Sequence, residues 1–136
     1  MITKTKQLAI FLENKPGVLA KVCEDLAKNK INILALTVSD TIDHTVLRII
    51  VDKSREAVHL LETTGAIVIE RDVILLELPN RPGALRQVSR FLSEKKHNIE
   101  YLYCSSGPNQ KTGTLVLRTK NVEKSFELLK KFKIKA

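Results

Sequence analysis

Cysteine, aromatic residues and long apolar runs are all scarce in this sequence of 136 residues. Its two cysteines, Cys23 and Cys104, stand alone and form no CxxC pair, which argues against a disulfide framework and against a zinc site. No window approaches the run of about 18 apolar residues that a membrane helix requires. The first residues, "MITKTKQLAIFLE", lack the apolar run and cleavage site of a signal peptide. We therefore expect a cytoplasmic protein that has no contact with a membrane.

The sequence also lacks the residue patterns of the commoner catalytic and nucleic-acid sites. Its histidines, His44, His59 and His97, have no metal-ligand spacing to one another or to the cysteines. No Ser/His/Asp, Cys/His or paired-carboxylate arrangement can be inferred, and "GPNQKTG" lacks the Walker spacing and precedes a predicted strand, which favours a hairpin loop. Tyr101 and Tyr103 lie in a predicted strand without the aromatic consensus of RNA-binding sheets. We therefore expect no enzyme, no metal ion and no cofactor.

Positive charge is unevenly distributed along the chain. Residues 1–71 carry ten Lys and Arg against nine Asp and Glu, and residues 72–136 carry thirteen against six, so that net charges of +1 and +7 sum to +8. Much of the excess lies in "KNVEKSFELLKKFKIKA", where lysines share a segment with the apolar residues Val122, Phe126 and Leu129. This pattern is typical of the solvated face of an amphipathic helix. It favours a surface helix over a nucleic-acid interface.

What the sequence does contain is an internal repeat. "LENKPGVLAKV" begins at Leu12, and "LPNRPGALRQV" begins 66 residues later, at Leu78. At this offset identical residues recur along the copy, among them Asn14, Pro16, Gly17, Leu19, Val22, Leu26, Lys30, Asn32, Ile33 and Leu36. After residue 40 the offset is expected to grow to 69, because "SSGPNQKTG" has three additional residues. The repeat indicates a duplicated domain, with one copy in residues 1–71 and the other in residues 72–136.

Each copy has the same predicted order of secondary structure. "KQLAIFLE" and "DVILLELP" alternate like strands, and Pro16 or Pro82 follows at the position expected for the first residue of a helix, where no N–H is needed. Leu19, Val22 and Leu26 then recur at helical spacing, as do their counterparts. The remaining predicted segments, strand–strand–helix–strand, are "INILALTVS", "HTVLRIIVD", "SREAVHLLETT" and "AIVIE" in the first copy, and "HNIEYLYCSS", "TGTLVLRTK", "VEKSFELLKKF" and "FKIKA" in the second.

This order of elements predicts the fold. Each copy reads βαββαβ, and right-handed crossovers close that order into a four-stranded antiparallel sheet with both helices on one face. One such copy has a thin core, and pairing two copies covers exposed sheet edges. "AIVIERDVILLEL" leaves almost no linker between them. We therefore expect an α+β protein of two ferredoxin-like domains, with antiparallel sheets paired side by side and helices on one face.

The repeated segments resemble a known family. "NKPGVLAKVCEDLAKNKINILAL" and "NRPGALRQVSRFLSEKKHNIEYL" are similar to the ACT domain, a small-molecule regulatory module of amino-acid metabolism. Both contain an amide residue, a variable residue, Pro-Gly, an apolar pair, a helix and the "NI" that opens the second strand. The similarity extends over nearly the whole chain and is greatest to stand-alone tandem ACT proteins. It implies an amino-acid ligand bound at interfaces between paired ACT domains.

The resemblance also implies which residues contact the ligand. They are Asn14, Gly17, Val18, Leu19, Asn32 and Ile33 in the first copy, and Asn80, Gly83, Ala84, Leu85, Asn98 and Ile99 in the second. The N–H groups and dipole of a helix start suit a carboxylate, glycine permits close approach, and an amide can bind either end of an amino acid. The same residues also suit a purely structural turn with a capping asparagine. His97, Glu100, Tyr101 and Tyr103 depart from the first copy, which indicates a different ligand there or none.

Two hypotheses on function therefore stay open. In the first, the chain is a non-catalytic sensor that binds an amino acid and regulates a partner, with a metabolic enzyme as the candidate. In the second, it is a ligand-free regulatory or dimerisation module that acts only by binding a partner protein. Both include a homodimer, because ACT-like modules usually work across interfaces and two paired copies still leave sheet edges. Neither includes nucleic acid or a membrane.

Overall fold

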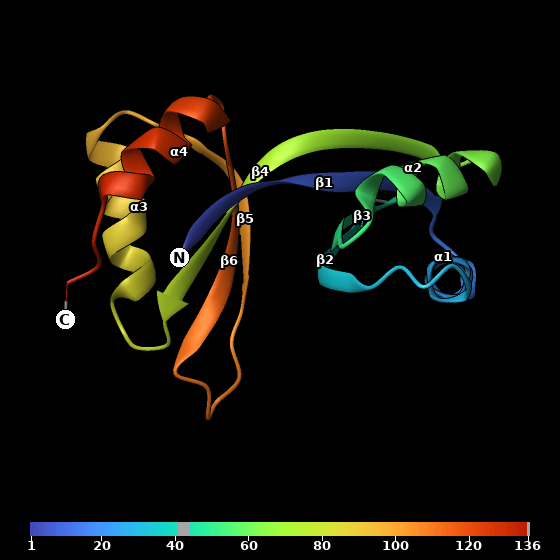
Figure 1. The fold of residues 1–136 in the computed structure, drawn as a ribbon, viewed down its shortest axis with the longest axis horizontal. Helices are drawn as coiled ribbons and strands as arrows, with labels where there is room; N and C mark the ends of the chain where they lie inside the picture. The colour runs from blue at the N-terminus through green and yellow to red at the C-terminus, as the bar shows by residue number, and fades with distance from the viewer. Residues whose placement is uncertain (41–43, 136) are drawn as a thin grey trace. The chain divides into compact units, whose positions relative to one another are not determined.

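The computed structural model describes residues 1–40 and 44–135 and divides the chain into two compact units (Figure 1). The first unit is Lys6–Arg71, and the second unit combines Met1–Thr5 with Asp72–Ala136. The elements are β1 (Ile2–Glu13), α1 (Val18–Lys28), β2 (Ile33–Asp40), β3 (His44–Val51), α2 (Ser54–Thr63), β4 (Ile67–Pro79), α3 (Ala84–Glu94), β5 (Ile99–Ser105), β6 (Thr112–Thr119) and α4 (Val122–Lys131). No helix in the described ranges is long and apolar enough to cross a membrane.

The six strands form an antiparallel sheet in the order β2-β3-β1-β4-β6-β5. In the first unit β3 pairs with both β1 and β2, and in the second unit β6 pairs with both β4 and β5. From β1 to β4 the chain follows the order βαββαβ, and from β4 to α4 it follows βαββα. The prediction of an α+β protein with two ferredoxin-like units is confirmed.

The first unit has its own hydrophobic core, which is built from alternate strand residues and one stripe of each helix. The buried members are Leu8, Ile10, Leu12, Val22, Leu26, Ile31, Leu47, Ile49, Val51, Ala57 and Leu61. Alternate residues of a strand point to the same side of the sheet, so one face of β1 and β3 supplies the strand contribution. Because α1 and α2 both contribute to this single cluster, both helices cover that face.

The second unit repeats this arrangement with its own core. The buried members are Ile74, Leu76, Leu78, Val88, Leu92, Leu115, Leu117, Val122 and Leu129. Val88 and Leu92 are four residues apart on α3, one above the other on the same helix face. Asn121 caps α4, because its side-chain oxygen accepts a hydrogen bond from the Lys124 N–H at 3.1 Å. The lysines of this helix remain exposed, as the amphipathic pattern predicts.

The fourth strand of the second unit comes from the N-terminus of the chain. The expectation that "FKIKA" forms this strand is wrong, because residues 132–135 follow α4 without regular secondary structure. Ile2–Thr5 of β1 belongs to the second unit instead. The Glu77 N–H donates a hydrogen bond to the Met1 carbonyl at 3.0 Å, and the Ile2 side chain packs against the second core.

Two long strands each serve both units. β1 contributes Ile2–Thr5 to the second unit and its remaining residues to the first. β4 joins "AIVIE" and "DVILLELP", which the sequence presented as separate strands, and it passes from one unit to the other between Arg71 and Asp72. The chain therefore crosses between the units twice, each time within a strand.

The strand register corrects the expected offset of 69 between the later parts of the two copies. Leu8 of β1 lies opposite Ile49 of β3, and Ile74 of β4 lies opposite Leu117 of β6. Leu8 and Ile74 are 66 residues apart, whereas Ile49 and Leu117 are 68 apart. The loop before β6 is therefore longer by two residues, not three. A difference of one residue matters in a strand, since it exchanges the buried and exposed faces.

The helices that follow the repeated motif begin later than expected. Pro16 and Pro82 lie in turns two residues before α1 and α3, so the prediction that they open these helices is wrong. The helix N-caps are Gly17 and Gly83, with φ of 87° and 90°. This left-handed backbone is costly for any residue with a Cβ. A Cβ at either glycine would meet no atom within 4 Å, so the requirement is for positive φ and not for close approach.

We expect Gly17→Ala and Gly83→Ala each to lower the free energy of unfolding by about 1–2 kcal/mol, because alanine is strained at positive φ. Urea denaturation monitored by circular dichroism measures this change. Gly107→Ala is the matched control, because its Cβ would meet only Gln110 side-chain atoms at ordinary contact distances from 3.5 Å. A loss at Gly107 as large as that at Gly17 would contradict the backbone explanation.

Candidate ligand-binding site

The first motif loop, Asn14–Gly17, connects β1 to α1 and is exposed along its length. The Asn14 side-chain amide donates to Asp40 Oδ1 at the end of β2, at 2.7 Å. Asn14 does not cap the helix, since the N-cap is Gly17 and no side chain bonds to the helix start. The capping role considered for Asn14 is therefore wrong, and its one recorded partner is itself an exposed side chain.

A pocket of about 620 Å³ opens beside this loop, between one side of α1 and the turn from α2 to β4. Gly17 and Val18 line it together with groups of both charges. Lys21 Nζ donates to Asp25 Oδ1 at 2.9 Å, and this hydrogen bond raises the pKa of Lys21 above its ordinary value, so its ammonium stays charged at neutral pH. Lys15 brings a second cation. We call this the loop pocket.

The second motif loop, Asn80–Gly83, differs because its asparagine is fully engaged within the protein. The Asn80 amide donates to the Gly107 carbonyl at 2.9 Å and to the Gln110 carbonyl at 2.8 Å. Its side-chain oxygen accepts from the Ser106 hydroxyl at 3.3 Å. Asn80 therefore fastens the motif loop to the loop between β5 and β6, where the second copy has additional residues.

The second motif loop is also in contact with the end of the chain. The Arg81 guanidinium and the Gln87 side-chain amide both donate to the Lys135 carbonyl. In the first copy, the residues that correspond to Arg81 and Gln87 are Lys15 and Lys21, which line the loop pocket. Both motif loops are exposed to solvent, but in the second unit the loop and the start of α3 are hydrogen-bonded to other segments of the chain.

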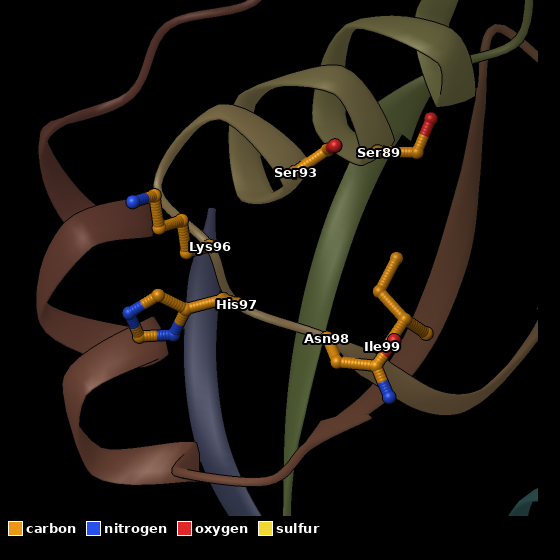
Figure 2. Close-up of a pocket in the computed structure, with 6 residues that line it drawn as sticks. All are labelled: Ser89, Ser93, Lys96, His97, Asn98 and Ile99. Carbon is orange, nitrogen blue, oxygen red and sulfur yellow. The ribbon is translucent and has the colours of Figure 1, made fainter.

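The predicted residues at the start of the second strand lie apart from the motif loops. In the second unit, Asn98 and Ile99 line a shallow pocket of about 380 Å³ with Ser89, Ser93 and the turn that carries Lys96 and His97. Figure 2 shows the two serines on α3 and Asn98 and Ile99 on the segment that follows the helix. None of the second motif loop lines this pocket.

In the first unit, Asn32 and Ile33 are fixed mainly by backbone contacts. The Asn32 N–H donates to Asp52 Oδ1 at 2.9 Å, and the Asn32 carbonyl accepts from the Asp52 N–H at 3.1 Å. Ile33 packs against the first core. Neither residue lines the loop pocket. Neither of these two pockets, then, combines motif-loop residues with Asn32, Ile33, Asn98 and Ile99 of the same unit.

The remaining site residues differ in their exposure. Val18 packs against the first core, and Ala84 is buried with 3% of its surface exposed. Leu19 and Leu85 are instead exposed at 38% and 42%, on the first turns of their helices. These two leucines are apolar surface at equivalent positions of the two motifs, where a further protein chain or ligand can reach them.

A buried polar cluster in the second unit was not anticipated from the sequence. His97 Nδ1 lies 2.6 Å from Ser125 Oγ, which lies 2.6 Å from Thr119 Oγ1. Ser125 and Thr119 are fully buried. The corresponding residues of the first unit are Ile31, Ala57 and Val51, all members of the first core. Comparing the two copies could have revealed this cluster. Matching Ser125 with Ala57 and Thr119 with Val51, however, requires the offset of 68, which is known only from the strand register.

Comparison with known proteins identifies the family. A family model described as an ACT domain pair matches residues 3–135. The chain belongs to the ACT domain pair family. A search of curated proteins returned no match.

Several solved structures are similar to this chain in fold. Protein BT0572 from Bacteroides thetaiotaomicron is 40% identical, with 95% of this chain and 88% of that chain covered and a TM-score of 0.88. The ligand-free regulatory subunit of aspartate kinase from Thermus thermophilus is 17% identical, with 97% of both chains covered and a TM-score of 0.71. The corresponding subunit from Thermus flavus is 16% identical, with 95% and 94% covered and a TM-score of 0.65. The two kinase subunits are similar in fold alone.

ACT domains are regulatory modules, and the two in this pair have become different from each other. The first ACT domain presents an open motif loop with a mixed-charge pocket beside it. In the second ACT domain, the loop after β5 and the end of the chain contact the motif loop. The six ligand-contact positions that the resemblance implies occur once in each domain, and their surroundings differ between the two domains.

Proposed function

We propose that this ACT domain pair binds an amino acid at the first motif loop and regulates a partner protein, without catalysing a reaction. The loop pocket is the observation that carries this proposal. Its ammonium groups, Lys15 and Lys21, suit a ligand carboxylate, and Asp25 suits a ligand ammonium. Phe11 and Val18 add apolar surface for a ligand side chain. A pocket with a few charged groups and an apolar wall is typical of small-molecule sites.

Asn14 is proposed to contact the ligand's polar head from the edge of this pocket. Its amide and its partner Asp40 are both exposed, so a ligand can replace the bond between them without leaving a buried group unpaired. Asn80 has no such freedom, because breaking its bonds would detach the β5–β6 loop. We therefore propose one ligand site at a motif loop in each chain.

We further propose that the protein works in the cytoplasm as a homodimer, with the regulated partner an enzyme of amino-acid metabolism. The edge strand β2 supports the homodimer, because Leu34, Leu36 and Val38 are exposed at 58%, 42% and 43%. An exposed apolar edge strand is a site for pairing with another chain. The regulatory subunits of aspartate kinase, which share the fold, indicate the class of partner.

The alternative function is a module that binds a partner protein and no metabolite. The second ACT domain favours it, because Asn80 and Arg81 of its motif loop are hydrogen-bonded to other segments of the chain. If the first domain is likewise an interaction surface, its exposed leucines and β2 would contact the partner. A screen of the twenty amino acids by thermal shift separates the two functions, because a ligand that binds only the folded protein raises its melting temperature.

For the amino acid found in that screen, we expect Asn14→Ala to weaken binding roughly ten- to a hundredfold, since a hydrogen bond to a charged group contributes about 1.5–3 kcal/mol. Titration calorimetry measures the affinity. Asn80→Ala is the matched control: it should leave the affinity unchanged and lower the free energy of unfolding by about 1–2 kcal/mol. Equal losses of affinity in both variants would place the ligand elsewhere. No binding at millimolar concentration would support the module without a ligand.

A further inference from the structure

The segment after α4, Phe132–Lys135, lies on the surface of α3 in an extended form. We call it the tail. Phe132 and Ile134 are half-buried and pack against the second core, whereas Lys133 and Lys135 are exposed. Phe132 has φ of −82° and ψ of 136°, which is extended backbone. The alternation of apolar and charged residues in "FKIKA", which suggested a strand, therefore places two apolar side chains against a helix.

Gln87 of α3 holds the tail by its backbone. Its Oε1 accepts from the Lys135 N–H at 2.7 Å, and its Nε2 donates to the Lys135 carbonyl at 3.0 Å. One side-chain amide thus binds both polar groups of one residue, as a neighbouring strand would do. The Arg81 guanidinium, from the second motif loop, donates to the same carbonyl. These contacts recognise the backbone of an extended chain and no particular side chain.

Aromatic stacking fixes the other end of the tail. The rings of Phe132 and Phe91 have centroids 4.4 Å apart at an interplanar angle of 26°. Such a pair contributes beyond the apolar area it buries. Beside the tail, an open groove of about 470 Å³ remains, with Arg86 and Arg90 among its lining residues. Phe132, Lys133 and Lys135 of the tail form part of the wall of this groove, and the space between the tail and the α3 residues Arg86 and Arg90 stays open.

The equivalent positions of α1 and its preceding loop carry neither an amide clamp nor an aromatic ring. The residues that correspond to Arg81, Gln87 and Phe91 are Lys15, Lys21 and Asp25, and Lys21 and Asp25 pair with each other. The second copy therefore has Gln87 and Phe91, which bind the tail, at the positions where the first copy has the ion pair of Lys21 and Asp25. The residues of α3 that differ from those of α1 contact the tail, so the tail accounts for the difference without an amino-acid ligand.

We propose that α3 carries a docking groove for an extended peptide with apolar residues at alternate positions, and that the tail is its resident and reversible occupant. The groove recognises Phe132 by stacking on Phe91 and recognises the backbone of Lys135 through Gln87. The tail is held at these two points and by Ile134, so it can leave while α4 and the core remain folded. The proposal does not depend on the amino-acid site and is tested without any amino acid.

The first test uses hydrogen exchange in the full chain. We expect the Lys135 amide to exchange at least tenfold more slowly than an unstructured amide, because Gln87 accepts its hydrogen bond. Gln87→Leu should remove that protection, whereas Lys21→Leu, at the matched position of α1, should leave it unchanged. Unprotected Lys135 in the wild-type chain, or protection that survives Gln87→Leu, would overturn the proposal.

The second test supplies the tail as a separate molecule. The peptide Phe-Lys-Ile-Lys-Ala, acetylated at its N-terminus, is titrated into a chain that ends at Lys131 and into the full chain, with binding followed by NMR shifts of α3. We expect saturable binding to the shortened chain and at least tenfold weaker binding to the full chain, where the attached tail competes. Phe91→Ala in the shortened chain should weaken binding about tenfold. Absence of binding to a folded shortened chain, or equal binding to both chains, would refute the groove; the exchange test decides if the shortened chain does not fold.

Discussion

Removal of Met1–Thr5 is expected to destabilise the second unit by about 3 kcal/mol or more while leaving the first unit folded. The deletion takes away the edge strand beside β4, including the hydrogen bond from Glu77 to the Met1 carbonyl. It also uncovers the part of the second core against which Ile2 packs. Several lost backbone bonds at about 1 kcal/mol each, together with one apolar side chain, account for this magnitude.

The same segment is anchored to α4, and this contact contributes to the expected loss. Lys4 forms an ion pair with Glu123, and its ammonium lies 5.9 Å from the centre of the Phe126 ring. Hydrogen exchange resolved by residue measures the effect in each unit separately. Thr3→Ala, an exposed change that keeps the strand, is the control. Equal loss of protection in residues 6–71 and 72–135 would contradict the assignment of this segment to the second unit.

Ser125→Ala is expected to lower the free energy of unfolding by about 2–3 kcal/mol, although it removes a single oxygen. Ser125 joins His97 to Thr119, and Thr119 is fully buried. Without Ser125, the buried Thr119 hydroxyl loses its bond, and an unsatisfied buried polar group costs about 1–3 kcal/mol. The His97 ring loses a contact as well. Urea denaturation measures the change.

The triple variant His97→Ile, Ser125→Ala, Thr119→Val should recover most of this loss and lie within about 1 kcal/mol of the wild type. It introduces the three residues found at the same positions of the first core, and replacing all members of a polar cluster by apolar groups is often nearly neutral. Ser93→Ala, at an exposed serine of α3, serves as the control for the loss of a hydroxyl. A triple variant less stable than Ser125→Ala would show that the cluster contributes through packing specific to the second unit.

The fold was largely predictable because each helix and strand carries a local pattern. The helical spacing of Leu19, Val22 and Leu26 and the alternation around Leu8 and Ile10 specify element type wherever they occur. The error in the fourth strand has a physical cause. "FKIKA" alternates as a strand does, but strand pairing is decided by competition for one sheet edge, and Ile2–Thr5 occupies it. No local pattern records such a competition.

The positions of the two motif loops in the fold could be predicted from the sequence, but the contacts that surround each loop could not. The repeated Asn-x-Pro-Gly marked both motif loops, and both lie at a helix start. That Asn14 bonds to an exposed carboxylate, while Asn80 bonds to two carbonyls of another loop, depends on contacts between residues 26 to 30 positions apart. The same Asn-x-Pro-Gly motif therefore makes different contacts in the two units, and the motif alone does not reveal them.

The shared strands have a consequence for the order in which the protein forms during synthesis. All residues of the first unit, Lys6–Arg71, leave the ribosome before any residue of the second except Met1–Thr5. Domains generally fold as units during synthesis, beginning nearest the N-terminus. Residues 1–5 therefore cannot join the second unit until Asp72 and the residues after it emerge. Residues 1–5 are thus made before the first unit but pair only with the second, and a nascent chain stalled after residue 71 would present this short strand to any neighbouring sheet edge.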